Sequence, residues 1–207
     1  MSMIDLGRLR SAAVAVDPFE HCVVPGFIPD DVASEVERDF PFIDQGGSFP
    51  LAMLDYGPAF RSLVDELYGD EVREAFGRQL GIDLTESPTT ITVRGRARAK
   101  DGRIHIDSST KLVTVLIYFN RNWQAEGGRL RLLRSRNSMD DMITEIPPES
   151  GMLVAFRCRE NAWHGHKPFD GVRRSIQLNW VVSAAAARRS DRRHRLSGVL
   201  KRMRLAG

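Results

Sequence analysis

The sequence predicts a mainly β protein with supporting helices, an α+β chain in which N-terminal helices pack on an antiparallel sandwich or jelly-roll core. The N-terminal half carries the hydrophobic periodicity of helices, whereas the segments after Thr89 are β-branched and alternating. The later segments are joined by turn-rich connections without helices, which disfavours a parallel βαβ sheet. We therefore expect a mainly helical support over residues 1–88 and a β core over residues 89–187.

In the N-terminal half, Pro29-Asp30-Asp31 is typical of a helix start, because carboxylates are stabilised at a helix N-terminus. Gly81 is a suitable residue to end a helix. The pattern predicts one strand and three helices, over His21–Val24, Val32–Phe40, Phe60–Tyr68 and Glu71–Leu80.

The C-terminal half contains apolar or alternating runs separated by glycine and proline. Gly127-Gly128 and Pro147-Pro148, the latter followed by Gly151, are typical of turns. The strands are predicted over Thr89–Ala97, Leu112–Phe119, Met152–Phe156 and Ser175–Val182.

Composition sets limits on the class of protein. A chain of 207 residues with 42% hydrophobic content is sufficient for one globular domain, which we assign to residues 1–187. No apolar run approaches the roughly 18 residues of a membrane span, so we expect a cytoplasmic protein. The two cysteines, Cys22 and Cys158, are too few for a zinc site or a disulfide framework and are expected to be buried thiols.

The charge of the chain is concentrated at its C-terminal end. The segment 188–207 holds eight Lys or Arg residues against one Asp, whereas the whole chain has a net charge of only +3. Such a basic tail can bind nucleic acid, acidic lipid or an acidic partner, but a charge run is more often a solvated face.

The triplet His105-Ile106-Asp107 places an imidazole and a carboxylate two residues apart, and on an extended segment both point to the same side. Two histidines and one carboxylate on one side of a metal form the facial triad of non-haem Fe(II) oxygenases. A third ligand must come from elsewhere in the chain. The remaining histidines are His21, His164, His166 and His194.

A strand with a polar face follows the pair His164 and His166. Alternation places its polar residues on one face and its apolar residues on the other, so that the polar face is expected to line a cavity. An arginine with a nearby hydroxyl suits the distal carboxylate of 2-oxoglutarate, because a guanidinium bonds to a carboxylate through two charge-assisted hydrogen bonds. The polar face comprises Arg173, Ser175, Gln177 and Asn179.

From about Arg103 to Val182 the chain resembles the prolyl 4-hydroxylase-like branch of the 2-oxoglutarate/Fe(II)-dependent dioxygenase superfamily. The similarity covers about 80 residues with the motifs in family order. They are His105-Ile106-Asp107, Thr114–Asn120 (TVLIYFN), Trp123, Gly127–Leu132 (GGRLRL), Pro147-Pro148, Gly151–Phe156 (GMLVAF), His164 and Gly171–Ser175 (GVRRS). The resemblance implies a double-stranded β-helix, which is a jelly-roll core.

The resemblance also implies roles for individual residues. His105, Asp107 and His164 are implied as iron ligands, and Arg173, Tyr118 and Ser175 as the 2-oxoglutarate site. His164 is preferred because Pro168 follows it by four residues, as in the family. The segment from His164 to Arg173 is one residue shorter than the family pattern, so His166 stays an alternative ligand.

The cofactors implied are Fe(II), 2-oxoglutarate as co-substrate and O2, with ascorbate as an additional reductant. The expected reaction hydroxylates an aliphatic C–H of an amino acid, a proline-like peptidyl residue or a small metabolite, and releases succinate and CO2. The alternative function is a non-catalytic module that binds nucleic acid or a partner through the basic tail. For the dioxygenase, nucleic acid is not the expected partner. The sequence does not indicate an oligomeric state.

A cluster of basic residues precedes the metal motif. It either forms a cationic rim for an acidic substrate or is a solvated strand face. Its members are Arg94, Arg96, Arg98, Lys100 and Arg103.

Overall fold

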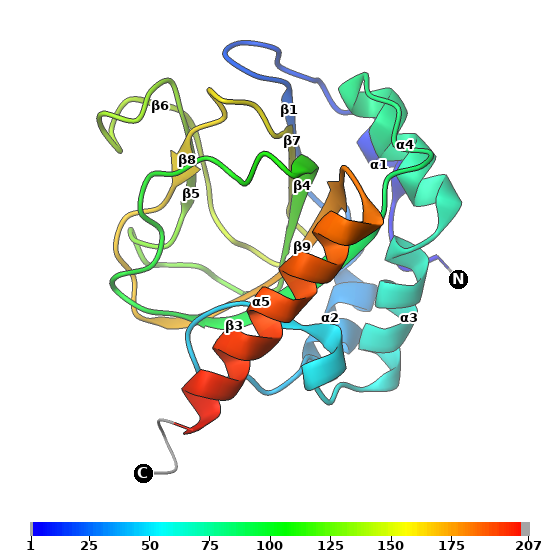
Figure 1. Ribbon diagram of the computed structural model, residues 1–207, viewed down its shortest axis with the longest axis vertical. Coiled ribbons are helices and arrows are strands. Elements are labelled where there is room, and N and C mark those ends of the chain that lie inside the picture. Colours follow the sequence, from blue (N-terminus) through cyan, green and yellow to red (C-terminus); the bar gives the residue numbers. More distant parts are fainter. Residues whose placement is uncertain (1, 204–207) are drawn as a thin grey trace.

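Two antiparallel sheets and a set of helices make up the fold (Figure 1). The structure is a computed structural model that describes residues 2–203, with side chains as far as residue 196. The larger sheet has six strands in the order β1-β7-β4-β9-β3-β2, and the smaller has three in the order β6-β5-β8. All pairings between these named strands are antiparallel.

The larger sheet is built from both halves of the chain. Its strands are β1 (His21–Val24), β2 (Phe49–Pro50), β3 (Thr89–Ala97), β4 (Lys111–Tyr118), β7 (Leu153–Arg157) and β9 (Gly171–Val181). The smaller sheet contains β5 (Leu130–Leu133), β6 (Met142–Ile146) and β8 (His164–Gly165).

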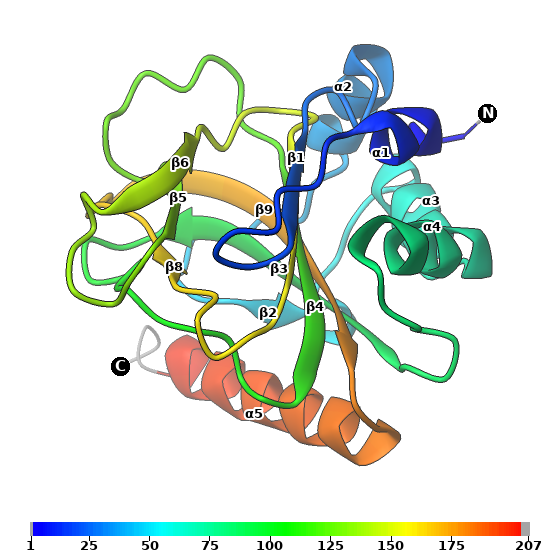
Figure 2. The same ribbon diagram turned by 90° about the horizontal axis from the view of Figure 1, so that it is seen from above.

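Four helices lie on the side of the larger sheet that faces away from the smaller one (Figure 2). They are α1 (Leu6–Ser11), α2 (Asp30–Arg38), α3 (Pro58–Leu67) and α4 (Asp70–Leu80), and a short 3-10 helix, η1 (Leu51–Met53), precedes α3. A fifth helix, α5 (Ala184–Met203), packs against β2, β3 and β9.

Local sequence explains where these helices begin and end. Asp30 and Asp31 lie in the first turn of α2, and Pro58 occupies the first turn of α3, where its missing N–H removes no helical bond. Gly81 ends α4 in the left-handed conformation, with φ of 64°. The three predicted helices and the predicted first strand are thereby confirmed.

The four strands predicted after Thr89 are also confirmed, with small changes at their ends. The last one is longer than predicted and begins at Gly171. Helices α1 and α5 and strands β2, β5, β6 and β8 were not predicted. The very short strands β2 and β8 carry no periodic signal, because each has only two residues.

Two apolar clusters hold these layers together. The first lies between the helices and the larger sheet, where Phe76 of α4 packs on Trp180 of β9 with ring centroids 5.3 Å apart. The second lies between the two sheets and includes Leu132 and Phe156. Since Ile176 and Leu178 of β9 belong to the first cluster, the alternate residues of β9 face the space between the sheets.

The basic segment predicted as a tail is helical in its described part. Its residues 188–203 belong to α5, and residues 204–207 of the prediction lie outside the described residues. Among the described helices, none has both the length and the apolar character needed to cross a membrane. Cys22 is buried, Cys158 is half-buried, and both thiols are free.

Candidate metal centre and adjoining cavity

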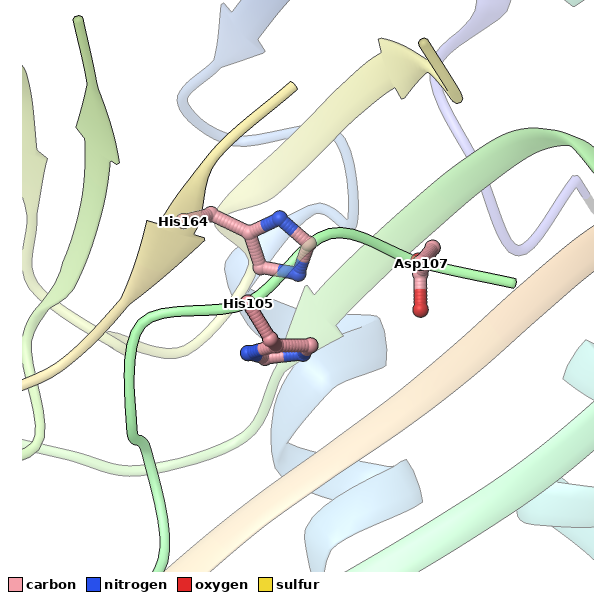
Figure 3. Close-up of side chains that lie close together, drawn as sticks. All are labelled: His105, Asp107 and His164. Atoms are coloured by element: carbon pink, nitrogen blue, oxygen red, sulfur yellow. The ribbon is translucent and has the colours of Figure 1, made fainter. Parts of the chain in front are cut away.

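The side chains of the His-x-Asp triplet and of the distant His164 converge at the edge of the smaller sheet (Figure 3). His105, Asp107 and His164 each offer a ligand atom, and these atoms lie within 4.8 Å of one another. Two backbone hydrogen bonds of 3.0 Å join His105 to His164, so the loop that carries the His-x-Asp triplet is fixed against β8. The rings of the two histidines lie with centroids 4.3 Å apart.

The backbone fixes the orientation and the tautomer of both imidazoles. The Nδ1 atom of His105 lies 2.8 Å from the carbonyl oxygen of Arg103, and that of His164 lies 2.9 Å from the carbonyl oxygen of Ala162. Because a carbonyl can only accept, each Nδ1 carries a proton, so that in the neutral tautomer Nε2 has the free lone pair. Burial, with the nearby His105 as a second cause, lowers the pKa of His164 to about 4, so this imidazole is neutral at neutral pH.

The carboxylate of Asp107 is held by two donors. Lys111 Nζ donates to Oδ1 at 2.8 Å, and Thr114 Oγ1 donates to Oδ2 at 2.5 Å. Burial acts to raise the pKa of Asp107, but the charge of Lys111, the neighbouring His164 and the two hydrogen bonds outweigh it and lower the pKa to about 2. Asn179 donates to Thr114 Oγ1 at 2.8 Å and thereby extends the network to β9.

A cavity of about 110 Å³ adjoins the three side chains between the sheets. This volume is far below the roughly 300–1,000 Å³ of pockets for drug-sized ligands, so the cavity suits a small molecule. The polar face of β9 lines one wall, as the alternation of the sequence predicts. The lining comprises Ser48, Thr92, Arg94, Gly102, His105, Leu116, Leu130, His164, Gly165, His166, Arg173, Ser175 and Gln177.

Arg173 lies in this cavity with only 5% of its surface exposed. Its Nε donates to the carbonyl oxygen of Gly128 at 2.7 Å, and its Nη2 lies 3.4 Å from the hydroxyl of Tyr118. The guanidinium also lies over the Tyr118 ring, 5.1 Å from the centroid. Tyr118 and Ser175 are paired across β4 and β9, so the two hydroxyl side chains and Arg173 lie on one face of the sheet.

The Gly127-Gly128 turn is required by the close packing around Arg173. Gly128 has φ of 77°, and a Cβ atom there would lie 2.7 Å from the indole of Trp123. A larger residue would therefore displace the carbonyl that accepts from Arg173.

His166 lies in the same cavity but outside the group of three converging ligand atoms. Its Nδ1 is 2.8 Å from the carbonyl oxygen of Lys167, and its backbone N–H donates to the carbonyl oxygen of Gly102. Burial, together with the charge of Arg173, lowers the pKa of His166 to about 4. The structure thus brings His164, and not His166, next to His105 and Asp107.

The other two histidines lie elsewhere. His21 is buried beside Phe19, with its Nδ1 2.9 Å from the Phe19 carbonyl oxygen, and His194 is on α5. Sequence reasoning missed Lys111 and Thr114 as partners of Asp107. Both residues lie soon after Asp107, at positions +4 and +7 and in the first part of β4. A strand that begins so close to Asp107 places its first side chains near the carboxylate, and this spacing could have indicated the two partners.

The donor set fits ferrous iron. Two imidazoles and one ionised carboxylate on one side of a site match the non-haem Fe(II) facial triad, and each ligand has an outer hydrogen-bond partner that orients it. The side chain of His105 is exposed whereas that of His164 is buried, so the site is open to solvent on one side.

Comparison with known proteins agrees with this geometry. Residues 96–182 match the family model described as the 2OG-Fe(II) oxygenase superfamily, and the match contains all three converging residues. No curated protein matches the chain by sequence.

Several solved structures share the fold. A prolyl-4-hydroxylase from Pseudomonas putida is 18% identical, with a TM-score of 0.53 over 85% of this chain and 90% of that one. A prolyl hydroxylase from Trichoplax adhaerens, solved with a hypoxia inducible factor peptide, is 20% identical, with a TM-score of 0.56 over 86% and 87%. A viral collagen prolyl hydroxylase from Paramecium Bursaria Chlorella virus-1 is 14% identical, with a TM-score of 0.54 over 81% and 98%.

The family match confirms the resemblance drawn from the sequence, and the shared fold covers most of the chain. Residues 96–182 thus match the 2OG-Fe(II) oxygenase superfamily, and the chain shares its fold with solved prolyl hydroxylases.

Proposed function

We propose that this enzyme hydroxylates an aliphatic C–H bond of an amino acid, a proline-like peptidyl residue or a small metabolite. The observation that carries the proposal is the convergence of two histidines and one aspartate beside a small cavity that contains a buried arginine. Fe(II) with 2-oxoglutarate and O2 supplies the oxidation, which converts the C–H to an alcohol and 2-oxoglutarate to succinate and CO2.

We further propose that the two sheets form a double-stranded β-helix. Support comes from the antiparallel pairing and from the His105–His164 bridge, which extends the smaller sheet by one short segment. This fold would place ligands from the His-x-Asp loop and from β8 at one open end of the space between the sheets.

His105, Asp107 and His164 are the proposed iron ligands. The carbonyl partners of both Nδ1 atoms leave Nε2 as the nitrogen that would bind the metal, and Lys111 and Thr114 hold the carboxylate in its ionised state. These contacts orient the three ligand atoms toward one another.

Arg173, Tyr118 and Ser175 are the proposed anchor for the distal carboxylate of 2-oxoglutarate. The Nε of Arg173 donates to the Gly128 carbonyl and Nη2 to the Tyr118 hydroxyl, so Nη1 and the second N–H of Nη2 can donate to a carboxylate. The surrounding apolar side chains Leu116 and Leu130 reduce access of water to this end of the cavity. Ascorbate is proposed only as a reductant that keeps iron ferrous.

The proline-like substrate rests on similarity alone. The Trichoplax and Chlorella virus enzymes are named for prolyl and collagen prolyl hydroxylation, and the Trichoplax enzyme was solved with a peptide. The basic helix α5, on which the alternative function of a binding module depends, contacts β2, β3 and β9.

The test measures release of CO2 from 1-labelled 2-oxoglutarate with Fe(II) and O2. Wild-type protein should release CO2 slowly without a prime substrate, and His105→Ala, Asp107→Ala and His164→Ala should reduce the rate to background. His166→Ala is the matched control and should keep a measurable rate. Activity that survives in His164→Ala but is lost in His166→Ala would reverse the assignment of the third ligand.

A further inference from the structure

A second guanidinium, that of Arg94, lines the same cavity as Arg173. Arg94 on β3 is paired with Ser175 on β9, and Ser175 is paired in turn with Tyr118 on β4. The three side chains therefore form one row across the larger sheet and face the same side. Ser175 and Tyr118 of this row, but not Arg94, belong to the proposed 2-oxoglutarate anchor.

Arg94 lies nearer to solvent than Arg173. The side chain of Arg94 is 27% exposed, whereas Arg173 is 5% exposed. The hydrogen-bond partners of the Arg94 guanidinium lie outside β9, because Nη1 donates to Asp101 Oδ2 at 3.2 Å and Nη2 contacts Ser48 Oγ at 3.4 Å. Arg94 thus occupies the outer part of the cavity and Arg173 the inner part.

The charge of Arg94 is only partly balanced. Its one carboxylate partner, Asp101, also accepts from Arg98 Nη2 at 3.2 Å and from the Arg98 backbone N–H at 3.0 Å. Two guanidiniums therefore share one carboxylate. Burial, followed by the nearby Arg173, lowers the pKa of Arg94, which means that a further anion beside it would be stabilised.

We propose, on the basis of the proposed function, that Arg94 binds a carboxylate of the prime substrate. The enzyme then hydroxylates a small free carboxylic acid, such as a free amino acid, and not an interior residue of a peptide. The cationic cluster seen in the sequence is thereby divided. Arg94 faces the cavity, whereas Arg96 pairs at 2.8 Å with Asp170 and lies at the surface.

The alternative partner for Arg94 is 2-oxoglutarate itself. The inner site already offers Arg173 and two hydroxyl groups to one distal carboxylate, which is sufficient for a bidentate ion pair with additional hydrogen bonds. The terminal nitrogens of Arg94 contact Ser48 and Asp101 and not the anchor residues, so we assign Arg94 to a second, separate carboxylate.

The experiment is anaerobic calorimetry on the full chain saturated with Fe(II) and 2-oxoglutarate, so that no turnover occurs. The probes are each free proteinogenic L-amino acid, the α-amide of each, and the blocked tripeptide acetyl-Gly-Pro-Gly-amide. Wild type is compared with Arg94→Gln and with the matched control Arg96→Gln, which changes the same residue type on the same strand.

We expect at least one free acid to bind wild type, with its amide and the blocked peptide binding more weakly. Arg94→Gln should weaken the acid about 10- to 100-fold, as expected for loss of a charge-assisted bond. It should leave the affinity for 2-oxoglutarate within about twofold, which also shows that the cavity is intact. Arg96→Gln should change neither affinity.

Three results would overturn the assignment of Arg94. The first is equal affinity of wild type for acids and their amides. The second is that wild type binds 2-oxoglutarate but none of the free acids. The third is that Arg94→Gln loses affinity for 2-oxoglutarate but keeps its affinity for the free acid. A wild-type protein that binds neither Fe(II) nor 2-oxoglutarate would instead contradict the proposed function, on which this inference depends.

Discussion

The carboxylate of Asp107 shows how single residues prepare the centre. Its two oxygens are bonded to Lys111 and Thr114, and these contacts outweigh burial and lower its pKa to about 2. The carboxylate is therefore ionised over the whole pH range in which the protein is expected to work. The histidines are prepared in a different way, by backbone carbonyls that fix the tautomer.

Removing the hydroxyl of Thr114 should weaken iron binding. Thr114→Val keeps the shape of the side chain but leaves one Asp107 oxygen and the Asn179 amide without this partner. We expect the Fe(II) affinity, measured by anaerobic calorimetry, to fall about 10- to 100-fold, as is usual for outer-shell partners of a metal ligand. The control Thr144→Val, on β6 in the smaller sheet, should bind iron as wild type does. Equal affinities in both variants would contradict the role of Thr114.

Removing the guanidinium of Arg173 should weaken 2-oxoglutarate binding. Arg173→Met keeps most of the buried stem and should raise the dissociation constant for 2-oxoglutarate by about 100-fold, because a charge-assisted pair is lost. Fe(II) affinity should stay within about twofold, since the metal ligands are untouched. The control is Arg174→Met, whose guanidinium lies on the other face of β9 over the Phe40 ring. An unchanged 2-oxoglutarate affinity in Arg173→Met would exclude Arg173 as the anchor.

At the scale of elements, the edge strand β1 is fixed by a group of ion pairs at its start. Glu20 accepts from Arg159 at 2.6 and 3.2 Å and from Arg157 at 3.1 Å. The hydrogen bond from Arg159 is the main reason why the pKa of Glu20 lies below its ordinary value of 4.5. These contacts join the start of β1 to the end of the neighbouring strand β7 and to the segment that follows β7.

The stabilisation by Glu20 should depend on pH. A lowered pKa in the folded state stabilises the protein above the ordinary pKa, and this stabilisation is lost as the pH falls through the lowered value. Glu20→Gln should therefore lower the free energy of unfolding by about 0.5–1 kcal/mol at pH 7, because the group is partly exposed. The difference should shrink at pH 3 in urea unfolding, and the exposed neighbour Glu160→Gln should show little change at either pH. A difference between Glu20→Gln and wild type that is the same at both pH values would contradict this role.

The elements with clear periodicity were predictable from the sequence, and the short ones were not. The helix ending at Gly81 and the alternating strand Thr89–Ala97 follow from local signals. β8 has only two residues, and it exists because β5 and the His105 segment pair with it. Such tertiary pairing leaves no local pattern. For the same reason, alternation could predict that Arg173 faces a cavity, but not that Arg94 of β3 lies in the same row as Tyr118 and Ser175.

At the scale of the whole molecule, the helices support the sheet whose opposite face lines the cavity. The ring of Phe76 on α4 contacts that of Phe27, with centroids 6.1 Å apart, and that of Trp180, with centroids 5.3 Å apart. Phe76 thereby joins the helix layer to β9. Since Trp180 and Asn179 are consecutive in β9, packing on the helix side fixes the strand whose other side carries the polar residues of the site.

Truncating Phe76 should therefore destabilise the whole domain. Phe76→Ala is expected to lower the free energy of unfolding by about 3–5 kcal/mol, through lost burial and the cavity that remains. Phe42→Ala removes the same atoms from a side chain that is 90% exposed and should change stability by less than about 0.5 kcal/mol. Urea unfolding at neutral pH measures both, and similar values for the two variants would contradict the described packing.

The central claim is that His105, Asp107 and His164 hold Fe(II) beside a site for 2-oxoglutarate. Anaerobic titration of the metal-free protein with Fe(II) and then 2-oxoglutarate tests it most directly, through the weak visible charge-transfer absorption of the chelate. We predict an absorption band that requires both additions in wild type, persists in His166→Ala and disappears in His105→Ala. No band in folded wild-type protein, or an equal band in wild type and His105→Ala, would contradict the claim.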